Sequence, residues 1–414
     1  MLLILGFITT YSRLPPGSRN VLWAEDGAVF VARALEGSPL ASFLEPYAGY
    51  MHAFPRIVAS IAVNVVPLAY VPLALTVAAC LLTAFVSAFV YILLQPRIPA
   101  KVPRFAVWLG VVTLPIANVE VIGSLANSHW YLLVGLIVVL VTSQHHPAIL
   151  IASGVVVALA VLSDPLSGVF LPIVLVRLIA LRSPRQLVVP VIYLVSLGIQ
   201  LEVVLGSSLG EARALPTVPG LVRSTIFRVF LVGLSGESGA AAAYLSWGVL
   251  SLLMAIILVL TAVVWTMLRG GQLGGLAFLS TGTALVFFAA SASIRWTTKF
   301  DPATGITWEG SRYSILPITL VLISLAAAAA VWKQRRKSLI VGASAGVVLI
   351  ALLSIIALPD FAVTAREPQR AWVAEVAEAQ QACRTLPGSQ AVGLPIAPGG
   401  WKVLTTCDVV RGAR

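Results

Sequence analysis

The chain has 414 residues, of which 59% are apolar and 10% are charged, and its formal net charge is +11. Apolar runs such as residues 73–94 and 247–268 exceed the ~18 uncharged residues that a membrane-spanning helix needs. These runs show no strand alternation, and helices satisfy their own backbone groups in lipid, which excludes a transmembrane barrel. The sequence therefore predicts an all-α polytopic membrane protein.

The basic residues are concentrated in four short segments between apolar runs, and no acid lies in these segments. Cytoplasmic loops carry such an excess of Lys and Arg. We therefore assign these segments to the cytoplasm. The positive net charge then reflects the orientation of the chain in the membrane, and no nucleic-acid partner is expected. The segments contain Arg97, Lys101, Arg104, Arg177, Arg182, Arg185, Arg269, Lys333, Arg335, Arg336 and Lys337.

With these segments as anchors, the apolar runs predict about eleven transmembrane helices, with boundaries good to ~4 residues. The amino end is then cytoplasmic and the carboxyl end outside. Run 57–68 is treated as an outer-leaflet or re-entrant helix, because counting it as a crossing would move the basic segment 95–104 outside. The expected spans are 1–11, 69–94, 103–118, 130–143, 147–162, 165–182, 186–206, 243–268, 273–294, 313–332 and 338–358.

The extracytoplasmic face is the elaborate one, because the cytoplasmic loops are too short to hold a site. It is expected to contain amphipathic helices in a large first outer loop. We therefore expect the function to face outside. The outer segments are 12–68, 119–129, 163–164, 207–242, 295–312 and the tail 359–414.

The tail 359–414 reads as a small cap on the core 1–358. Its sequence predicts an amphipathic helix followed by two short strands and a turn rich in Pro and Gly. Cys383 and Cys407 both lie there, and because that face is oxidising, a disulfide between them is the economical interpretation. Cys80 lies in a span and is expected to be inert core.

Glu25 and Asp26 form an adjacent carboxylate pair in a chain that otherwise avoids charge. Asp26 could begin an amphipathic helix over 27–35, which would make it a helix cap. One cap needs one acid, however, and Trp23 looks like an interfacial anchor that holds the pair at headgroup level. Paired carboxylates there can deprotonate a sugar hydroxyl or hold a divalent cation against phosphate oxygens. The residues alone leave both interpretations open.

Downstream, residues 45–59 concentrate polar and aromatic side chains. Tyrosine rings stack on sugar rings and a guanidinium binds phosphate, so this set suits a sugar and phosphate site. The alternative is an interfacial belt in which Tyr and Arg sit at the headgroups, although such a belt leaves the histidine unexplained. The set consists of Glu45, Tyr47, Tyr50, His52 and Arg56.

Residues 127–132 add Asn127, His129 and Trp130 at the outer start of a span. A single histidine is more often a hydrogen-bonded structural residue than a catalyst. Nearby, Asp164 precedes a proline, and the simplest interpretation is that it caps the helix that begins at Pro165.

Residues 294–317 bring Arg295, Lys299, Arg312 and Tyr313 to the same outer face. Two or three cations near the outer leaflet can bind a lipid phosphate or diphosphate. The acids in the same stretch leave an ordinary solvated loop as the alternative. Arg312 is the favoured member because it enters a span directly.

The arrangement resembles the C-type glycosyltransferase fold, whose members take a sugar from a polyprenyl-phosphate carrier on the extracytoplasmic side of the membrane. The shared features are a first helix, an acidic pair soon after it in a large first outer loop, an eleven-span core and a carboxyl-terminal outer tail. In that superfamily a first-loop acid acts as base or metal anchor, which maps onto Glu25 or Asp26. Many members space these acids as Asp-x-Asp or Glu-x-Asp, whereas here they are adjacent.

The resemblance implies a transferase of the bacterial cytoplasmic membrane that passes a sugar to a cell-envelope glycan or glycolipid. Asp26 is expected to act as base and Glu25 to orient the acceptor or a divalent cation. Arg312, helped by Arg295, Lys299 or Arg56, is expected to hold the phosphate. The competing expectation is a flippase or transporter of a lipid-linked sugar, which should show repeat symmetry and broken helices.

Overall fold

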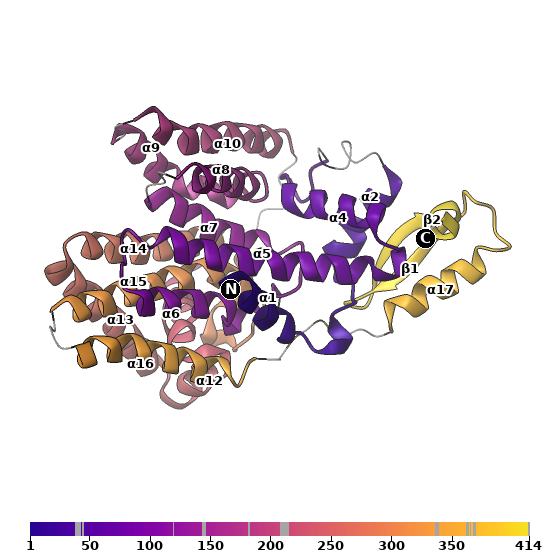
Figure 1. Ribbon diagram of the computed structural model, residues 1–414. Helices are drawn as coiled ribbons and strands as arrows, with labels where there is room; N and C mark the ends of the chain where they lie inside the picture. Colours follow the sequence, from indigo (N-terminus) through magenta and orange to yellow (C-terminus); the bar gives the residue numbers. More distant parts are fainter. Residues whose placement is uncertain are drawn as a thin grey trace.

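Helices build most of the chain, as the long apolar runs predict (Figure 1). The computed structural model describes all residues except 38–42, 44, 119, 143–145, 181–182, 208–214, 336–338, 362–363, 365, 367–369 and 413–414. The helices of the bundle are α1 (Leu2–Ser12), α5 (Val71–Leu93), α6 (Lys101–Val112), α7 (His129–Val141), α8 (Pro147–Val161), α9 (Leu171–Ile179), α10 (Val188–Gly206), α11 (Val218–Thr225), α12 (Val232–Trp247), α13 (Val249–Gly270), α14 (Gln272–Ile294), α15 (Ile315–Arg335) and α16 (Leu339–Ala357).

The other α-helices and both strands lie, together with the turn η2, at one end of the bundle, which we call the cap end (Figure 1). They come from two distant parts of the chain, the segment after α1 and the tail after α16. The first part forms a π-helical turn η2 (Asp26–Val31), α2 (Ala32–Glu36) and α4 (Ala53–Val65). The tail forms α17 (Trp372–Ala382), the antiparallel strands β1 (Ala391–Ile396) and β2 (Trp401–Thr406), and α18 (Cys407–Gly412).

Six helical stretches in the described part of the chain are long and apolar enough to cross a membrane, so the chain is a multi-pass membrane protein. In the stretch that contains α15, 83% of the apolar window is buried, against 33% for the stretch that contains α10. Thus α15 is the central helix, surrounded by α6, α7, α13, α14 and α16, while α8, α9 and α10 lie at one side (Figure 1). Each expected span contains a helix, although several are shorter than a full crossing.

The region 207–268 differs from the sequence expectation. A helical stretch fills Val218–Trp247, where only an outer segment was expected, and it is one of the six long apolar stretches. The next helix begins at Val249 and not at 243, because Gly248 adopts a left-handed φ of 53° that ends the preceding helix. Hydropathy hid this break, since the apolar residues before Gly248 merge with those of α13.

The cap end has a hydrophobic core of its own. The tail and the segment after α1 contribute to it together: Phe30 and Val31 of η2 pack in one cluster with Trp372 of α17 and Val403 of β2. The indole N–H of Trp372 also donates to the carbonyl of Leu68, at 2.8 Å. The tail is therefore not an independent lid, because more than half of the buried residues of this cluster lie in the first 126 residues of the chain.

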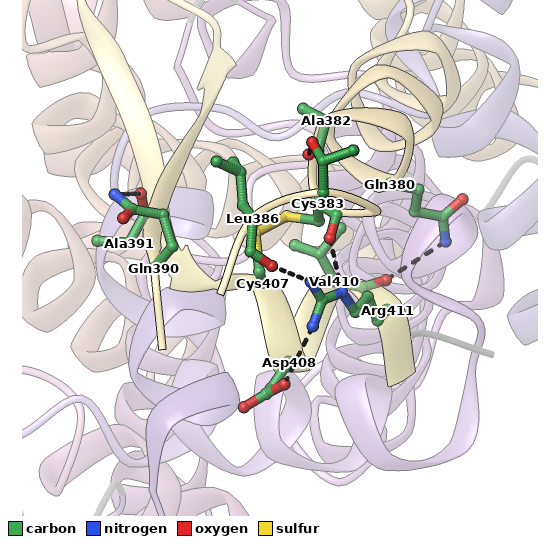
Figure 2. The surroundings of a disulfide bond; sticks show 11 residues. Gln380, Ala382, Cys383, Leu386, Gln390, Ala391, Cys407, Asp408, Val410 and Arg411 are labelled. Atoms are coloured by element: carbon green, nitrogen blue, oxygen red, sulfur yellow. Dashed lines mark hydrogen bonds and ion pairs between the residues drawn. A yellow bond between two sulfur atoms is a disulfide. The ribbon is translucent and has the colours of Figure 1, made fainter. Parts of the chain in front are cut away.

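A disulfide joins Cys383, just after α17, to Cys407 at the start of α18 (Figure 2). Both cysteines are fully buried. Beside the disulfide, the Arg411 guanidinium donates to the carbonyl of Cys383 at 2.7 Å and also to the carbonyl of Leu386. This is the pairing that the sequence favours, and it closes the tail around its two-stranded sheet.

Candidate functional site

Asp26 points into the interior of the protein. Its side chain is 1% exposed, and both carboxylate oxygens accept backbone hydrogen bonds, one from the N–H of Leu125 at 3.1 Å and one from the N–H of Ala126 at 2.6 Å. The segment that contains these two amides leads into α7. Asp26 therefore ties the first turn of η2 to the start of α7, 100 residues further along the chain.

A buried arginine faces this carboxylate from the tail. Arg366 is 1% exposed, donates to the carbonyl of Val21 at 2.9 Å and interacts electrostatically with Asp26. Burial raises the pKa of Asp26 to about 6, although Arg366 and the two backbone amides oppose the shift. We call Asp26, Arg366, Leu125 and Ala126 the junction. Because the Asp26 side chain is 1% exposed and both of its oxygens accept backbone hydrogen bonds, the carboxylate is poorly placed to take a substrate proton.

Glu25, one residue earlier, has the opposite environment. Its side chain is half-buried, and within the described part of the chain no hydrogen bond or ion pair reaches its carboxylate. It acts electrostatically on Tyr47 and on Arg312. Ala24 immediately before it has a φ of 45°, which costs a non-glycine residue about 1 kcal/mol or more, and its N–H donates to Ala397 of the tail at 2.6 Å. Glu25 and Asp26 are consecutive residues with helical dihedral angles, so their side chains point roughly 100° apart around the helix.

Aromatic side chains form a continuous cluster beside Glu25. The His52 ring lies 4.1 Å from the Tyr50 ring, 5.6 Å from Tyr47 and 5.4 Å from Phe30, measured between centroids. From His52 the cluster continues to His129 at 6.3 Å. The structure thus brings together aromatic residues that the sequence placed in separate outer segments.

The far side of the cluster is built by Trp130 and Tyr313. Their rings meet edge to face at 5.1 Å, and Trp130 is also 5.0 Å from His129. Both side chains are buried. Tyr313 lies in the turn η10 (Ser311–Ser314), which enters α15, so the cluster joins the cap end to the central helix of the bundle.

His52 is held as a neutral ring. Its Nε2 donates to the carbonyl of Tyr47 at 3.2 Å, and its Nδ1 is buried with no hydrogen-bond partner among the described residues. Burial, together with His129, Arg56 and Arg295, keeps the pKa of His52 well below its usual range. The ring is therefore suited to accept a hydrogen bond and unsuited to act as a cation.

His129 is fixed by contacts on both sides. Its Nδ1 donates to the carbonyl of Ala126 at 2.7 Å, and its Nε2 lies 3.2 Å from Oδ2 of Asp164. Asp164 also accepts the N–H of Leu166 at 2.8 Å, so it caps η5 (Pro165–Phe170), as the sequence predicts. Both imidazole nitrogens therefore lie against oxygen atoms, which fixes the orientation of the ring.

Two arginines supply positive charge to the cluster. Arg295, at the end of α14, is half-buried and acts electrostatically on Tyr47, Tyr50 and His52, and none of the residues described pairs with its guanidinium. Arg312 lies 3.8 Å from a carboxylate oxygen of Glu120 and acts on Tyr50. Burial raises the pKa of Tyr50, so its phenol stays protonated between these cations.

Lys299, Glu45 and Asn127 lie outside this cluster, and Arg56 lies at its edge. Lys299 forms an exposed ion pair with Glu309 at 2.7 Å, as expected of a solvated loop. Glu45 pairs with Arg33 at 3.3 Å on the surface. Arg56 is buried with its guanidinium 5.7 Å above the ring of Phe30. The amide of Asn127 donates to the carbonyl of Glu120 at 2.9 Å, which makes Asn127 part of the segment that leads into α7.

A divalent cation does not fit these residues well. Asp26 uses both oxygens on backbone amides, which leaves Glu25 as the one available carboxylate of the pair. No group of three or more His, Cys, Asp or Glu residues suitable for a metal occurs in the part of the chain that the structure describes. We derive no chemical step through a metal.

Two residues of the site have no role assigned from the sequence, although Glu120 stands out there as an ionisable residue at a helix end. Glu120 accepts the N–H groups of Gly310 at 3.1 Å and Arg312 at 3.4 Å, and so holds the turn that carries Arg312. Arg366 supplies the buried charge that faces Asp26. Both lie in outer segments with no recognisable pattern, and only their rarity in such apolar surroundings could have marked them.

Comparisons with known proteins leave the family open. No family model, no curated protein and no solved structure matches the chain.

Proposed function

We propose that the chain is an integral membrane glycosyltransferase of the bacterial cytoplasmic membrane. It would have a C-type fold with about eleven spans, its cap end outside, and would move a sugar from a polyprenyl-phosphate donor to a cell-envelope glycan or glycolipid. The observation that carries the proposal is the pair of charges Glu25 and Arg295 beside Tyr47, neither of which has a partner among the described residues. Unpaired charges in half-buried positions are costly, and function is the usual reason for keeping them.

The chemistry assigned to Glu25 is general base catalysis. Its carboxylate takes the proton from the acceptor hydroxyl while that oxygen bonds to the anomeric carbon of the donor sugar. The bond from the anomeric carbon to the phosphate oxygen breaks, and its electron pair leaves with the lipid phosphate. A single displacement of this kind inverts the anomeric centre. This assignment exchanges the roles that the sequence suggested for Glu25 and Asp26.

The leaving phosphate needs only positive charge, which Arg295 and Arg312 can provide. Arg312 is held in position by Glu120, whereas Arg295 has no partner among the described residues and is available for the ligand. Tyr47 interacts electrostatically with Glu25 and Arg295, and Tyr50 interacts with Arg295 and Arg312. Their rings suit contact with a sugar face.

A transporter of the same lipid-linked sugar is the second candidate, and one observation favours it. The helical stretch Val218–Trp247 is broken at Gly236, where φ is 71°, and broken helices are common in transporters. No unpaired carboxylate is needed for transport, so this candidate leaves Glu25 unexplained.

Reconstituted protein with a radiolabelled polyprenyl-phosphate sugar separates the two candidates. The enzyme predicts release of polyprenyl phosphate with transfer of label to an envelope glycan acceptor, and loss of both in Glu25→Gln. The transporter predicts movement of intact donor between leaflets without cleavage. Intact donor on both sides, with no released phosphate under any acceptor condition, would contradict the transferase proposal.

A further inference from the structure

A cavity of about 280 Å³ lies at the seam between the first outer segment and the tail. We call it the seam cavity. It opens at the surface of the cap end and is distinct from the cluster around Tyr47 and His52. Its lining residues are Val21, Leu22, Arg370, Trp372, Glu375, Pro395, Ile396 and Ala397.

The walls of the seam cavity combine apolar side chains with one charged pair. Trp372, Ile396 and Leu22 supply buried apolar surface. Glu375 is only 12% exposed, and a carboxylate oxygen lies 3.4 Å from a guanidinium nitrogen of Arg370. An aromatic wall with a carboxylate and a guanidinium beside it offers apolar contact together with hydrogen-bond acceptors and donors.

The seam cavity is attached directly to the segment that carries Glu25. The N–H of Ala24 donates to the carbonyl of Ala397 at 2.6 Å, and the N–H of Ala397 donates to the carbonyl of Leu22 at 3.3 Å. Leu22 thus lines the cavity three residues before Glu25. Three residues span at most ~11 Å of chain, so a ligand in the cavity lies close to the candidate base.

We propose that the seam cavity binds one sugar unit of the acceptor glycan, next to the unit whose hydroxyl is deprotonated at Glu25. This inference rests on the proposed function and names its acceptor side. The volume is at the small end of the range for ligand pockets, which suits one sugar ring and is too small for a polyprenyl chain. The Glu375 and Arg370 pair also favours a ligand with hydroxyl groups over a hydrocarbon.

Binding can be tested without any donor. Saturation-transfer NMR with the full-length protein in nanodiscs would use a panel of methyl hexosides and pentosides. Val21→Phe fills the cavity, and Val373→Phe is the matched control, because Val373 is 44% exposed on α17 and does not line the cavity. We expect at least one glycoside to receive saturation from the wild-type protein and from Val373→Phe, and none from Val21→Phe.

Glu375→Gln provides a second test if Val21→Phe fails to fold, since it removes the rim charge without changing volume. We expect it to weaken glycoside binding and to raise the acceptor KM about tenfold, with kcat unchanged. Absence of binding by the wild-type protein, or unchanged binding in both cavity variants, would overturn the inference. Glycoside binding that disappears in Val21→Phe, in a protein that never releases polyprenyl phosphate, would keep the sugar site and reject the transferase.

Discussion

The junction contains Asp26, and the aromatic cluster lies beside Glu25, one residue earlier in the chain. The two regions differ in whether their charged side chains have partners. In the junction, Asp26 meets two backbone amides and faces Arg366, so every charge has a partner. In the cluster, Glu25 and Arg295 have none among the described residues. Adjacent carboxylates therefore need not have the same role. A buried charge with partners holds the fold, whereas a half-buried charge without one is available for a ligand.

The largest effect is expected from Glu25→Gln, which removes the base and leaves the shape of the side chain. The rate of polyprenyl-phosphate release should fall by ~10²–10⁴-fold, the usual contribution of general base catalysis. The melting temperature should not change, because no described residue bonds to the carboxylate. Glu45→Gln is the matched control, since Glu45 lies in the same outer segment but pairs with Arg33 on the surface. An equal loss of rate in Glu25→Gln and Glu45→Gln would contradict a specific role for Glu25.

Replacing both Cys383 and Cys407 by Ala should destabilise the cap end by about 2–4 kcal/mol, which is typical of a native disulfide. The disulfide closes a segment with a sequence separation of 24. The core that it stabilises includes η2, so the junction should loosen with it. Thermal unfolding and limited proteolysis of the tail would measure the effect, and an unchanged melting temperature would show that the shared core suffices.

Asp26→Asn should affect stability before chemistry. An amide can accept only one of the two backbone hydrogen bonds, and leaving a buried N–H unsatisfied costs about 1–3 kcal/mol. The variant also removes the charge that faces Arg366. We expect a lower melting temperature and, for the molecules that remain folded, a rate within about tenfold of the wild type. An Asp26→Asn variant that is folded and as stable as the wild type, but has no activity, would indicate that Asp26 is the base.

The pH dependence of stability should contain a contribution from Asp26. Burial raises its pKa from 3.8 to about 6, so the folded protein binds this proton more tightly than the unfolded chain does. The contribution is fully present below about pH 4 and is lost as the pH rises through 6. The difference in melting temperature between the wild type and Asp26→Asn should therefore vary across this window and become constant above it. A difference independent of pH would contradict the assigned burial.

The smallest effect is expected from replacing the basic residue Arg295. Arg295→Gln should raise the donor KM by about tenfold through loss of one charge-assisted hydrogen bond. Lys299→Gln should leave the donor KM unchanged, because Lys299 is paired with Glu309 at the surface. The two residues lie four positions apart, so the comparison separates a charge at the site from a charge in a solvated loop. Equal effects would indicate a general attraction for anions.

Much of the fold could be predicted from the sequence, because apolar runs report directly on membrane helices. The region after residue 207 was missed since its helix contains Gly236, Glu237 and other polar residues that lower the hydropathy. The helix and the two strands of the tail were predicted from periodicity and turn residues. Its shared core with the first outer segment was not, because a contact such as Trp372 with Leu68 leaves no trace in local pattern.

The residues of the candidate site were easier to predict than the role of each residue. Tyr47, His52, His129 and Tyr313 were selected for their chemistry, and the structure brings them into one aromatic cluster. The roles of Glu25 and Asp26 depend on which side chain turns inward, and the bonds that hold Asp26 inward come from the amides of Leu125 and Ala126, 99 and 100 residues away. Long-range hydrogen bonds of this kind are not encoded in local spacing.

A cryo-EM structure with a non-cleavable polyprenyl phosphonate sugar would show which residues bind the phosphate and which acid faces the sugar. We expect the phosphonate oxygens to lie within hydrogen-bond distance, ~2.7–2.9 Å, of the guanidinium groups of Arg295 and Arg312. We also expect the open face of the anomeric carbon to be turned toward Glu25, with Asp26 still bound to the amides of Leu125 and Ala126. A phosphonate bound away from both arginines, or an Asp26 released toward the sugar, would contradict this expectation.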